Sequence, residues 1–160
     1  MSARRPTIHL GTDHAGFKLK ETVSRFLRRG GYDVRDHGAF SEERSDYPDF
    51  IIPAAEAVAK SRGRAMGIVF GGSGIGECIA ANKVRGVRAA LVYDRYSAVM
   101  SREHNDANVM CLGGRTPSGA ERRAKELIRL WLKTPFSGAS RHARRLRRIA
   151  GYEQRRRLQK

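Results

Sequence analysis

Cysteine and long apolar runs are scarce in this chain. Its two cysteines, Cys78 and Cys111, lie far apart in the sequence, so they suggest no disulfide framework, and neither has the spacing of a zinc site. No apolar run approaches the roughly 20 residues that cross a bilayer. The basic N-terminus is not followed by the apolar core of a signal peptide. We therefore expect a soluble cytoplasmic protein that does not associate with membranes.

Acidic residues are also few relative to basic ones. The 160 residues include 32 lysines and arginines but only 16 aspartates and glutamates, which gives a net charge of +16. Such an excess attracts nucleic acid, acidic membranes or phosphorylated small molecules. The excess is concentrated in residues 141–160, where one aromatic residue offers little for base stacking. A nucleic-acid-binding module stays open as an alternative, but we expect only nonspecific, salt-sensitive contacts.

Apolar stretches of strand length alternate with amphipathic stretches of helix length along the chain. Strands are expected at 7–11, 32–38, 66–70, 87–93 and 107–114, and helices at 17–31, 49–61, 77–84, 94–105, 118–134 and 141–160. This alternation predicts an α/β fold with a five-stranded, mostly parallel sheet and helices on both faces. We expect one domain over 1–160, with 141–160 as a basic C-terminal helix. Pro53 is expected in the first turn of its helix.

The segment GGSGIGE, residues 71–77, has four glycines in seven residues and follows an apolar strand. Glycine lets backbone N–H groups converge, and the start of the next helix adds positive partial charge, so the loop predicts an anion site. The segment matches neither the GxxxxGK[ST] nor the GxGxxG pattern.

Glu77 closes this loop. Its carboxylate could remove a proton from a carbon next to a carbonyl while the N–H groups hold the enediolate oxyanion, with no metal or cofactor. The helix start lowers the pKa of such a carboxyl and burial raises it, and the sequence does not decide between them.

Six segments occur in order from about Ile8 to Arg145: GTDHAGFKLK, SDYPDF, GGSGIGECIAANK, SREHNDANV, LGGR and RHARR. Together they resemble the type B ribose-5-phosphate isomerases, a sugar-phosphate isomerase family that includes the lactose-pathway enzymes. The resemblance implies a Rossmann-like αβα sandwich that interconverts ribose 5-phosphate and ribulose 5-phosphate through a cis-enediolate, within the pentose phosphate pathway. It also implies a homodimer, or alternatively a tetramer, whose active sites are built from both subunits. A hexose 6-phosphate isomerase, acting on allose or galactose phosphates, is the alternative within the enzymes.

The resemblance also implies catalytic roles. Part of the family has a cysteine base at the position of Gly71; this chain has glycine there, so it resembles the branch in which the glutamate at Glu77 is the base. His104 would open the furanose ring, with Asp13 assisting, and Ser73 would contact the substrate oxygens. From the residues alone, an ordinary surface histidine is the favoured interpretation of His104, and a helix cap is the commoner role for Asp13.

The implied substrate contacts include more residues. The backbone of Gly72, Gly74, Ile75 and Gly76 would surround the substrate oxygens, Asn105 would bond the sugar, and His14, Arg115, Arg141 and Arg145 would bind the phosphate. Arg115 or the tail arginines are expected from the partner subunit. Tyr47 could line the pocket or only pack. The other basic residues between 147 and 160 are expected to form a solvated face.

Overall fold

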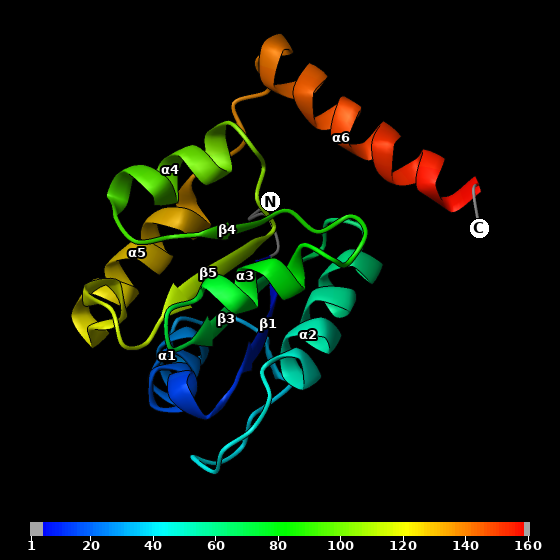
Figure 1. The fold of residues 1–160 in the computed structure, drawn as a ribbon. Coiled ribbons are helices and arrows are strands. Elements are labelled where there is room, and N and C mark those ends of the chain that lie inside the picture. The colour runs from blue at the N-terminus through cyan, green and yellow to red at the C-terminus, as the bar shows by residue number, and fades with distance from the viewer. Residues whose placement is uncertain (1–4, 159–160) are drawn as a thin grey trace.

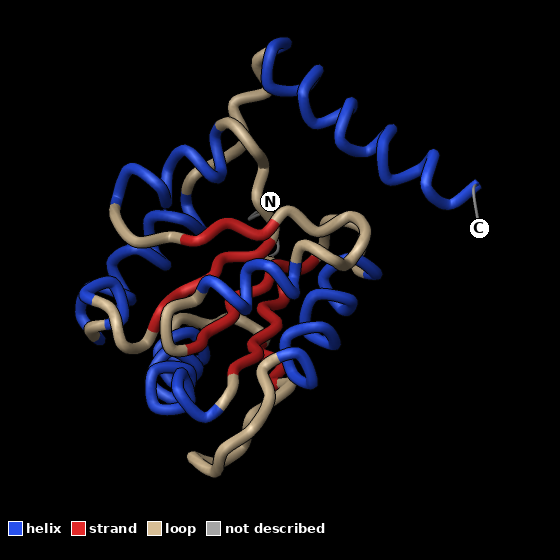
Figure 2. The backbone as a smooth tube through the Cα atoms, in the orientation of Figure 1, coloured by secondary structure: helices blue, strands red, loops and turns tan. Residues whose placement is uncertain are grey.

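Five short strands form one sheet in the centre of the molecule (Figures 1 and 2). They are β1 (Thr7–Thr12), β2 (Val34–Asp36), β3 (Ala65–Gly71), β4 (Ala89–Leu91) and β5 (Val109–Gly113). Their spatial order is β2-β1-β3-β5-β4, and every neighbouring pair is parallel. This computed structural model describes residues 5–158, with side chains described through residue 155.

Helices cover both faces of the sheet because strand side chains alternate between the faces. One face packs against α1 (Phe17–Arg29), α4 (Arg95–Glu103) and α5 (Glu121–Lys133), and the other against α2 (Pro48–Lys60) and α3 (Ile75–Ala81). Short 3-10 helices occupy His14–Gly16 and Pro117–Gly119. The neighbours Val69 and Phe70 of β3 are both fully buried, yet they belong to the cores on opposite faces. The expected α/β sandwich is confirmed, with a sheet that is parallel throughout.

The strand order reverses between β1 and β3, which are neighbours in the sheet. From β1 the chain crosses to β2 on one side and then returns past β1 to β3 on the other. Ligands of parallel α/β sheets bind beyond the carboxyl ends of the strands at such a reversal. We call this end of the sheet the carboxyl edge, where Thr12, Gly71 and Gly113 lie. The opposite end, where Thr7, Ala65 and Val109 lie, is the amino edge.

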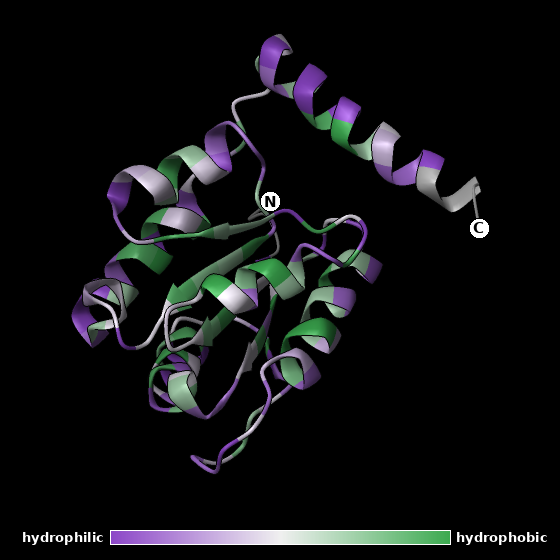
Figure 3. Cartoon of the chain, in the orientation of Figure 1, coloured by the Kyte–Doolittle hydropathy of each residue, from purple (hydrophilic) through white to green (hydrophobic). Residues whose placement is uncertain are grey.

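The basic segment forms α6 (Ser140–Leu158), which extends away from the sheet and its covering helices (Figure 1). Its surface is mostly hydrophilic (Figure 3), although Leu146 is half-buried and Ile149 is 50% exposed. The Glu153 carboxylate accepts a hydrogen bond from the backbone N–H of Gly86 at 3.2 Å. The prediction of a solvated face at Lys160 lies outside the described residues, as do the side chains at 156 and 157.

Two expectations about individual elements were wrong. Helix α2 begins at Pro48, so Pro53 lies in the second turn and not the first. The reason is that Tyr47 starts the helix, its carbonyl accepting from the backbone N–H of Ile51 at 3.0 Å. The strand expected over 87–93 is paired with β5 only over Ala89–Leu91.

Candidate active site

The glycine loop connects β3 to α3 at the carboxyl edge. Gly74 precedes the helix with a φ of 79°, in the left-handed region that favours glycine. The backbone N–H groups of Gly114 and Arg115 donate to the carbonyls of Gly71 and Gly72 at 2.7 and 3.0 Å. The turn after β5 therefore supports the glycine loop from the side.

Glu77 lies in the first turn of α3, and its carboxylate fills the space that a side chain at position 71 would need. Only 4% of the residue is exposed. A Cβ atom built on Gly71 would lie 1.9 Å from Glu77 Oε1 and 2.0 Å from Glu77 Cδ. Any side chain at position 71 would thus have to displace the carboxylate. The carboxylate lies where a base attached to residue 71 would begin.

The structure decides the competition over the pKa of Glu77. Burial raises this pKa above its ordinary value, and the nearby negative charge of Asp13 raises it further. Hydrogen bonds from the backbone N–H groups of Glu77 and Gly74 act in the opposite direction but do not prevail. A carboxylate with a raised pKa is a stronger base than a solvated one, which suits proton abstraction.

Asp13 and His14 follow the carboxyl end of β1. One Asp13 oxygen accepts from the backbone N–H groups of Ala15 and Gly16 at 2.9 and 3.3 Å, so the residue is indeed a helix cap. It is also 8% exposed and close enough to Glu77 to affect its pKa. His14 Nδ1 lies 3.3 Å from the backbone nitrogen and oxygen of Ser45. Asp13 therefore caps the 3-10 helix and also lies at the candidate site, beside Glu77.

Three further side chains adjoin the loop. Ser73 is exposed, and its Oγ accepts from the backbone N–H of Ile75 at 3.2 Å. The Tyr47 ring lies against Gly76, where a built Cβ would be 2.9 Å from the ring. Arg115 lies beside Gly72, with its Cδ 3.7 Å from a Cβ built there. Arg115 thus reaches the glycine loop of its own chain. Of the arginines expected from the partner subunit, only Arg141 and Arg145 remain.

His104 and Asn105 lie at the other end of the sheet. His104 caps the C-terminus of α4, and both residues precede β5. Because β5 runs parallel to β3, they lie at the amino edge, whereas Glu77 follows the carboxyl edge. The five residues of β5 separate the two edges by about 17 Å. A single chain does not bring His104 to Glu77.

The first turn of α6 lies against His104. His142 of α6 is 3% exposed, and its ring centroid lies 4.1 Å from that of His104. Its Nδ1 lies 3.0 Å from Ser137 Oγ. Burial, His104 and the flanking Arg141 and Arg145 lower the pKa of His142, which favours a neutral ring against His104. The sequence assigned His142 no role, because nothing in its spacing relates it to a histidine 38 positions earlier. Arg141 and Arg145 are both exposed.

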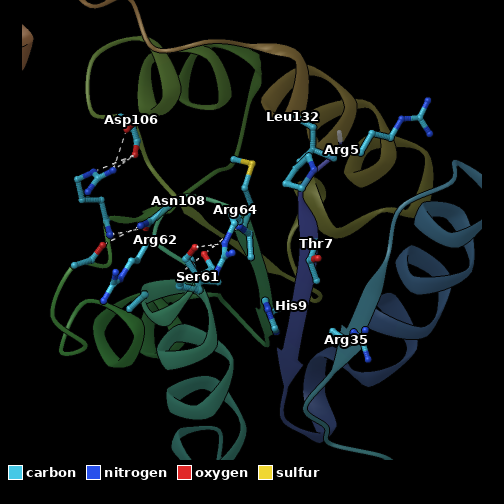
Figure 4. Close-up of a pocket in the computed structure, with 18 of the residues that line it drawn as sticks. Arg5, Thr7, His9, Arg35, Ser61, Arg62, Arg64, Asp106, Asn108 and Leu132 are labelled. Atoms are coloured by element: carbon cyan, nitrogen blue, oxygen red, sulfur yellow. Dashed lines mark hydrogen bonds and ion pairs between the residues drawn. The ribbon is translucent and has the colours of Figure 1, made fainter. Parts of the chain in front are cut away.

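A cavity of about 960 Å³ opens at the amino edge (Figure 4). Its wall includes Arg62, Arg64, Arg88 and Arg102 but none of the glycine loop. Within residues 5–158, no group of three histidine, cysteine, aspartate or glutamate side chains is placed to hold a metal ion. Over the same residues, no helix is long and apolar enough to span a membrane.

Comparisons with known proteins agree with this arrangement. A model of the family described as Ribose/Galactose Isomerase matches residues 8–149. Ribose-5-phosphate isomerase B of Mycolicibacterium paratuberculosis is 44% identical over 147 residues, which cover 91% of this chain and 91% of the relative.

Two solved structures extend the likeness to the fold. Ribose-5-phosphate isomerase B of Clostridium thermocellum superposes with a TM-score of 0.87 at 46% identity, covering 93% of this chain and 98% of that one. The enzyme of Mycoplasma genitalium, solved with bound ribulose 5-phosphate, gives a TM-score of 0.89 at 37% identity, covering 95% and 99%.

Proposed function

The chain belongs to the ribose/galactose isomerase family, and we propose on that premise that it interconverts ribose 5-phosphate and ribulose 5-phosphate. The activity is an aldose–ketose isomerisation, which moves hydrogen between two adjacent carbons and oxygens of one molecule. Because a sugar phosphate does not cross a bilayer unaided, we place the enzyme in the cytoplasm, where its substrate would be held. The two sugar phosphates place the proposed reaction in the pentose phosphate pathway.

The buried carboxylate over Gly71 is the observation that carries the proposal. Glu77 would take the proton from C2 of the opened aldose, which leaves a cis-enediolate. It would return the proton to C1 while the hydroxyl proton of O2 passes to O1, which gives the ketose. The raised pKa supports both steps, because the group must accept the proton and then release it. With Glu77 as the base, the chain would belong to the glutamate branch of the family.

The glycine loop would stabilise the intermediate. The backbone N–H groups of Gly72, Ser73 and Gly76 would donate to the oxyanion of the enediolate. Those of Gly74 and Glu77 bond the Glu77 carboxylate, and that of Ile75 bonds Ser73 Oγ. Ser73 would contact the same oxygens, since its hydroxyl is exposed beside the loop. His14 and Arg115 would take the phosphate from the near side, because each lies at a carboxyl-edge turn of its own chain.

We further propose that the active site is shared within a homodimer. The roughly 17 Å between the edges leaves Glu77 without a ring-opening acid in its own chain. His104 and Asn105 of the partner subunit would supply it, with Asp13 assisting, and Arg141 and Arg145 of the partner subunit would complete the phosphate site. Exposed apolar side chains on α3 support an interface beside the loop: Ile75 is 54% and Ile79 is 56% exposed.

Purified protein assayed with three sugar phosphates tests the proposed substrate. We expect ribose 5-phosphate to be isomerised with a higher kcat/KM than allose 6-phosphate or galactose 6-phosphate. If either hexose phosphate is preferred, the proposed mechanism stands but ribose 5-phosphate is not the substrate. Absence of isomerisation with all three would overturn the proposed function.

A further inference from the structure

The turn between α4 and β5 has an unusual backbone conformation. Asp106 has a φ of 42°, in the left-handed region that residues with a side chain rarely adopt. Asp106 directly follows His104 and Asn105, and its conformation sets how the chain turns from these two residues into β5. Such a conformation persists only where surrounding contacts impose it. The contacts around Asp106 therefore decide how His104 and Asn105 are presented.

Two arginines hold this turn from opposite sides. The Arg88 guanidinium donates to the Asp106 carbonyl at 2.7 Å and to Oδ2 of the same residue at 3.1 Å. Arg102 donates to the other carboxylate oxygen, Oδ1, at 2.8 Å. The carboxylate thus bridges two guanidinium groups, which come from the segment before β4 and from α4. Figure 4 shows Asp106 at the wall of the amino-edge cavity.

The same two arginines also bond the backbone of the turn. Arg88 Nε donates to the Asn105 carbonyl at 3.0 Å, and Arg102 Nη1 donates to the Ala107 carbonyl at 2.6 Å. With the Asp106 carbonyl, three successive carbonyls from 105 to 107 are fixed by two side chains.

Both arginines are themselves held in place. The Arg102 guanidinium lies over the Trp131 ring at 5.6 Å and donates to the Thr134 carbonyl at 3.2 Å. The backbone N–H of Arg88 donates to Asn108 Oδ1 at 2.8 Å. The Arg102 side chain is 14% exposed and that of Arg88 is 31% exposed. We call Arg88, Arg102 and Asp106 the clamp. Its two arginines are held by α5 and by the residue before β5, so these elements fix the position of the turn.

We propose that Arg88, Arg102 and Asp106 are positioning residues for ring opening. They act through the conformation of the turn, which aims His104 and Asn105 at the sugar, and they do not touch the substrate. The inference rests on the proposed function, because it assigns a consequence to the ring-opening role of His104. A purely structural network would support folding but would not distinguish one direction of the reaction from the other.

Variants of Asp106 separate the conformation from the clamp. Asp106→Gly tolerates the positive φ but removes the carboxylate, whereas Asp106→Asn tolerates the same φ and keeps an oxygen that accepts hydrogen bonds. We expect Asp106→Gly to slow single-turnover conversion of ribose 5-phosphate, which is mainly cyclic, by about tenfold. Conversion of ribulose 5-phosphate, which has no five-membered ring to open, should slow by less than about twofold. Asp106→Asn should give a rate between those of the native protein and Asp106→Gly, because its single amide oxygen can accept from only one of the two arginines.

Two comparison variants make the result decisive. Glu126→Gln removes the ion pair with Arg95 at the other end of α4, so it should leave the ratio of the two rates unchanged. His104→Asn sets the size of the directional effect. If His104→Asn is directional and Asp106→Gly slows both directions equally or neither, the clamp has no positioning role. If His104→Asn itself is not directional, the ring-opening role fails, and the positioning role fails with it.

Discussion

The two edges of the sheet are built in different ways. At the carboxyl edge, bare backbone places the reactive group: the glycine loop leaves room for Glu77, which is 4% exposed. At the amino edge, long charged side chains do the placing, and the Asp106 side chain that they hold is 39% exposed. Burial raises the pKa of Glu77 at the carboxyl edge, whereas Arg88, Arg102 and Asp106 at the amino edge are paired with one another and hold the turn after His104. The proposed proton transfer and the proposed ring opening therefore depend on different kinds of environment, and each can be perturbed separately.

The largest effect is expected at the carboxyl edge from Glu77→Gln. The amide keeps the shape of the side chain and cannot accept the proton, so kcat should fall at least about a hundredfold. Substrate binding should be retained, because the phosphate contacts lie elsewhere. Steady-state kinetics and calorimetric binding of ribose 5-phosphate measure the two quantities. Near-normal turnover would remove Glu77 from the mechanism.

A second variant tests whether bare backbone is required beside the base. Gly71→Ala puts a Cβ where the Glu77 carboxylate lies, and because that carboxylate is the end of a flexible side chain, we expect displacement without unfolding. Turnover should fall about ten- to a hundredfold while the melting temperature changes little.

Gly151→Ala, on α6 and away from the glycine loop, is the control for this variant. A Cβ there meets only Arg155 Nη1, at the ordinary contact distance of 3.8 Å, so turnover should be nearly unchanged. Equal effects of the two alanines would show that the position of the carboxylate is not what matters.

At the amino edge, the tail arginines should affect binding and not the chemical step. Arg141 and Arg145 are four residues apart on α6 and share one face of the helix, so they can grip one phosphate together. Replacing both with alanine should raise KM about tenfold. Replacing Arg147, on the opposite face of α6, together with Arg155, more than two turns further along, should leave the kinetics unchanged. A matching rise in KM for the second pair would point to the overall charge of the tail.

The smallest effect is expected when the two edges are tested together. Glu77→Gln and His104→Asn chains, produced together with different tags, can be purified as mixed dimers. If the site is shared, one of the two sites in each mixed dimer has both native residues, so about half of the native activity should return. If each chain forms its own site, no complete site exists and activity should stay at the level of the single variants.

The sequence was sufficient for the architecture but not for the distances within it. Local patterns, such as the apolar strand before Gly71 and the amphipathic helices, predicted the α/β sandwich because each depends on neighbouring residues. The pKa of Glu77 depends on how deeply α3 packs, and the separation of His104 from Glu77 depends on the direction in which β5 runs beside β3. Those properties arise from contacts between distant segments. Pro53 was misplaced because Pro48, five residues earlier, also suits a helix start.

The amino edge was the harder half to predict. Arg88, Arg102 and Asp106 look like ordinary members of a basic chain, and the left-handed turn at Asp106 has no glycine to indicate it. Their relation appears only when the segment before β4 lies beside the end of α4.

The steric conflict between positions 71 and 77 also restricts how such a protein can change over generations. On the proposed mechanism, a lineage that acquired a side chain at position 71 while keeping Glu77 would displace the proposed base. A lineage that lost Glu77 first would, on the same mechanism, pass through a descendant with no base at all. The gain of a side chain at position 71 and the loss of Glu77 would each be harmful alone, and each would be tolerated only in the presence of the other. Geneticists call this relation reciprocal sign epistasis. Exchange between the two kinds of base therefore calls for a spare gene copy or a period of relaxed selection.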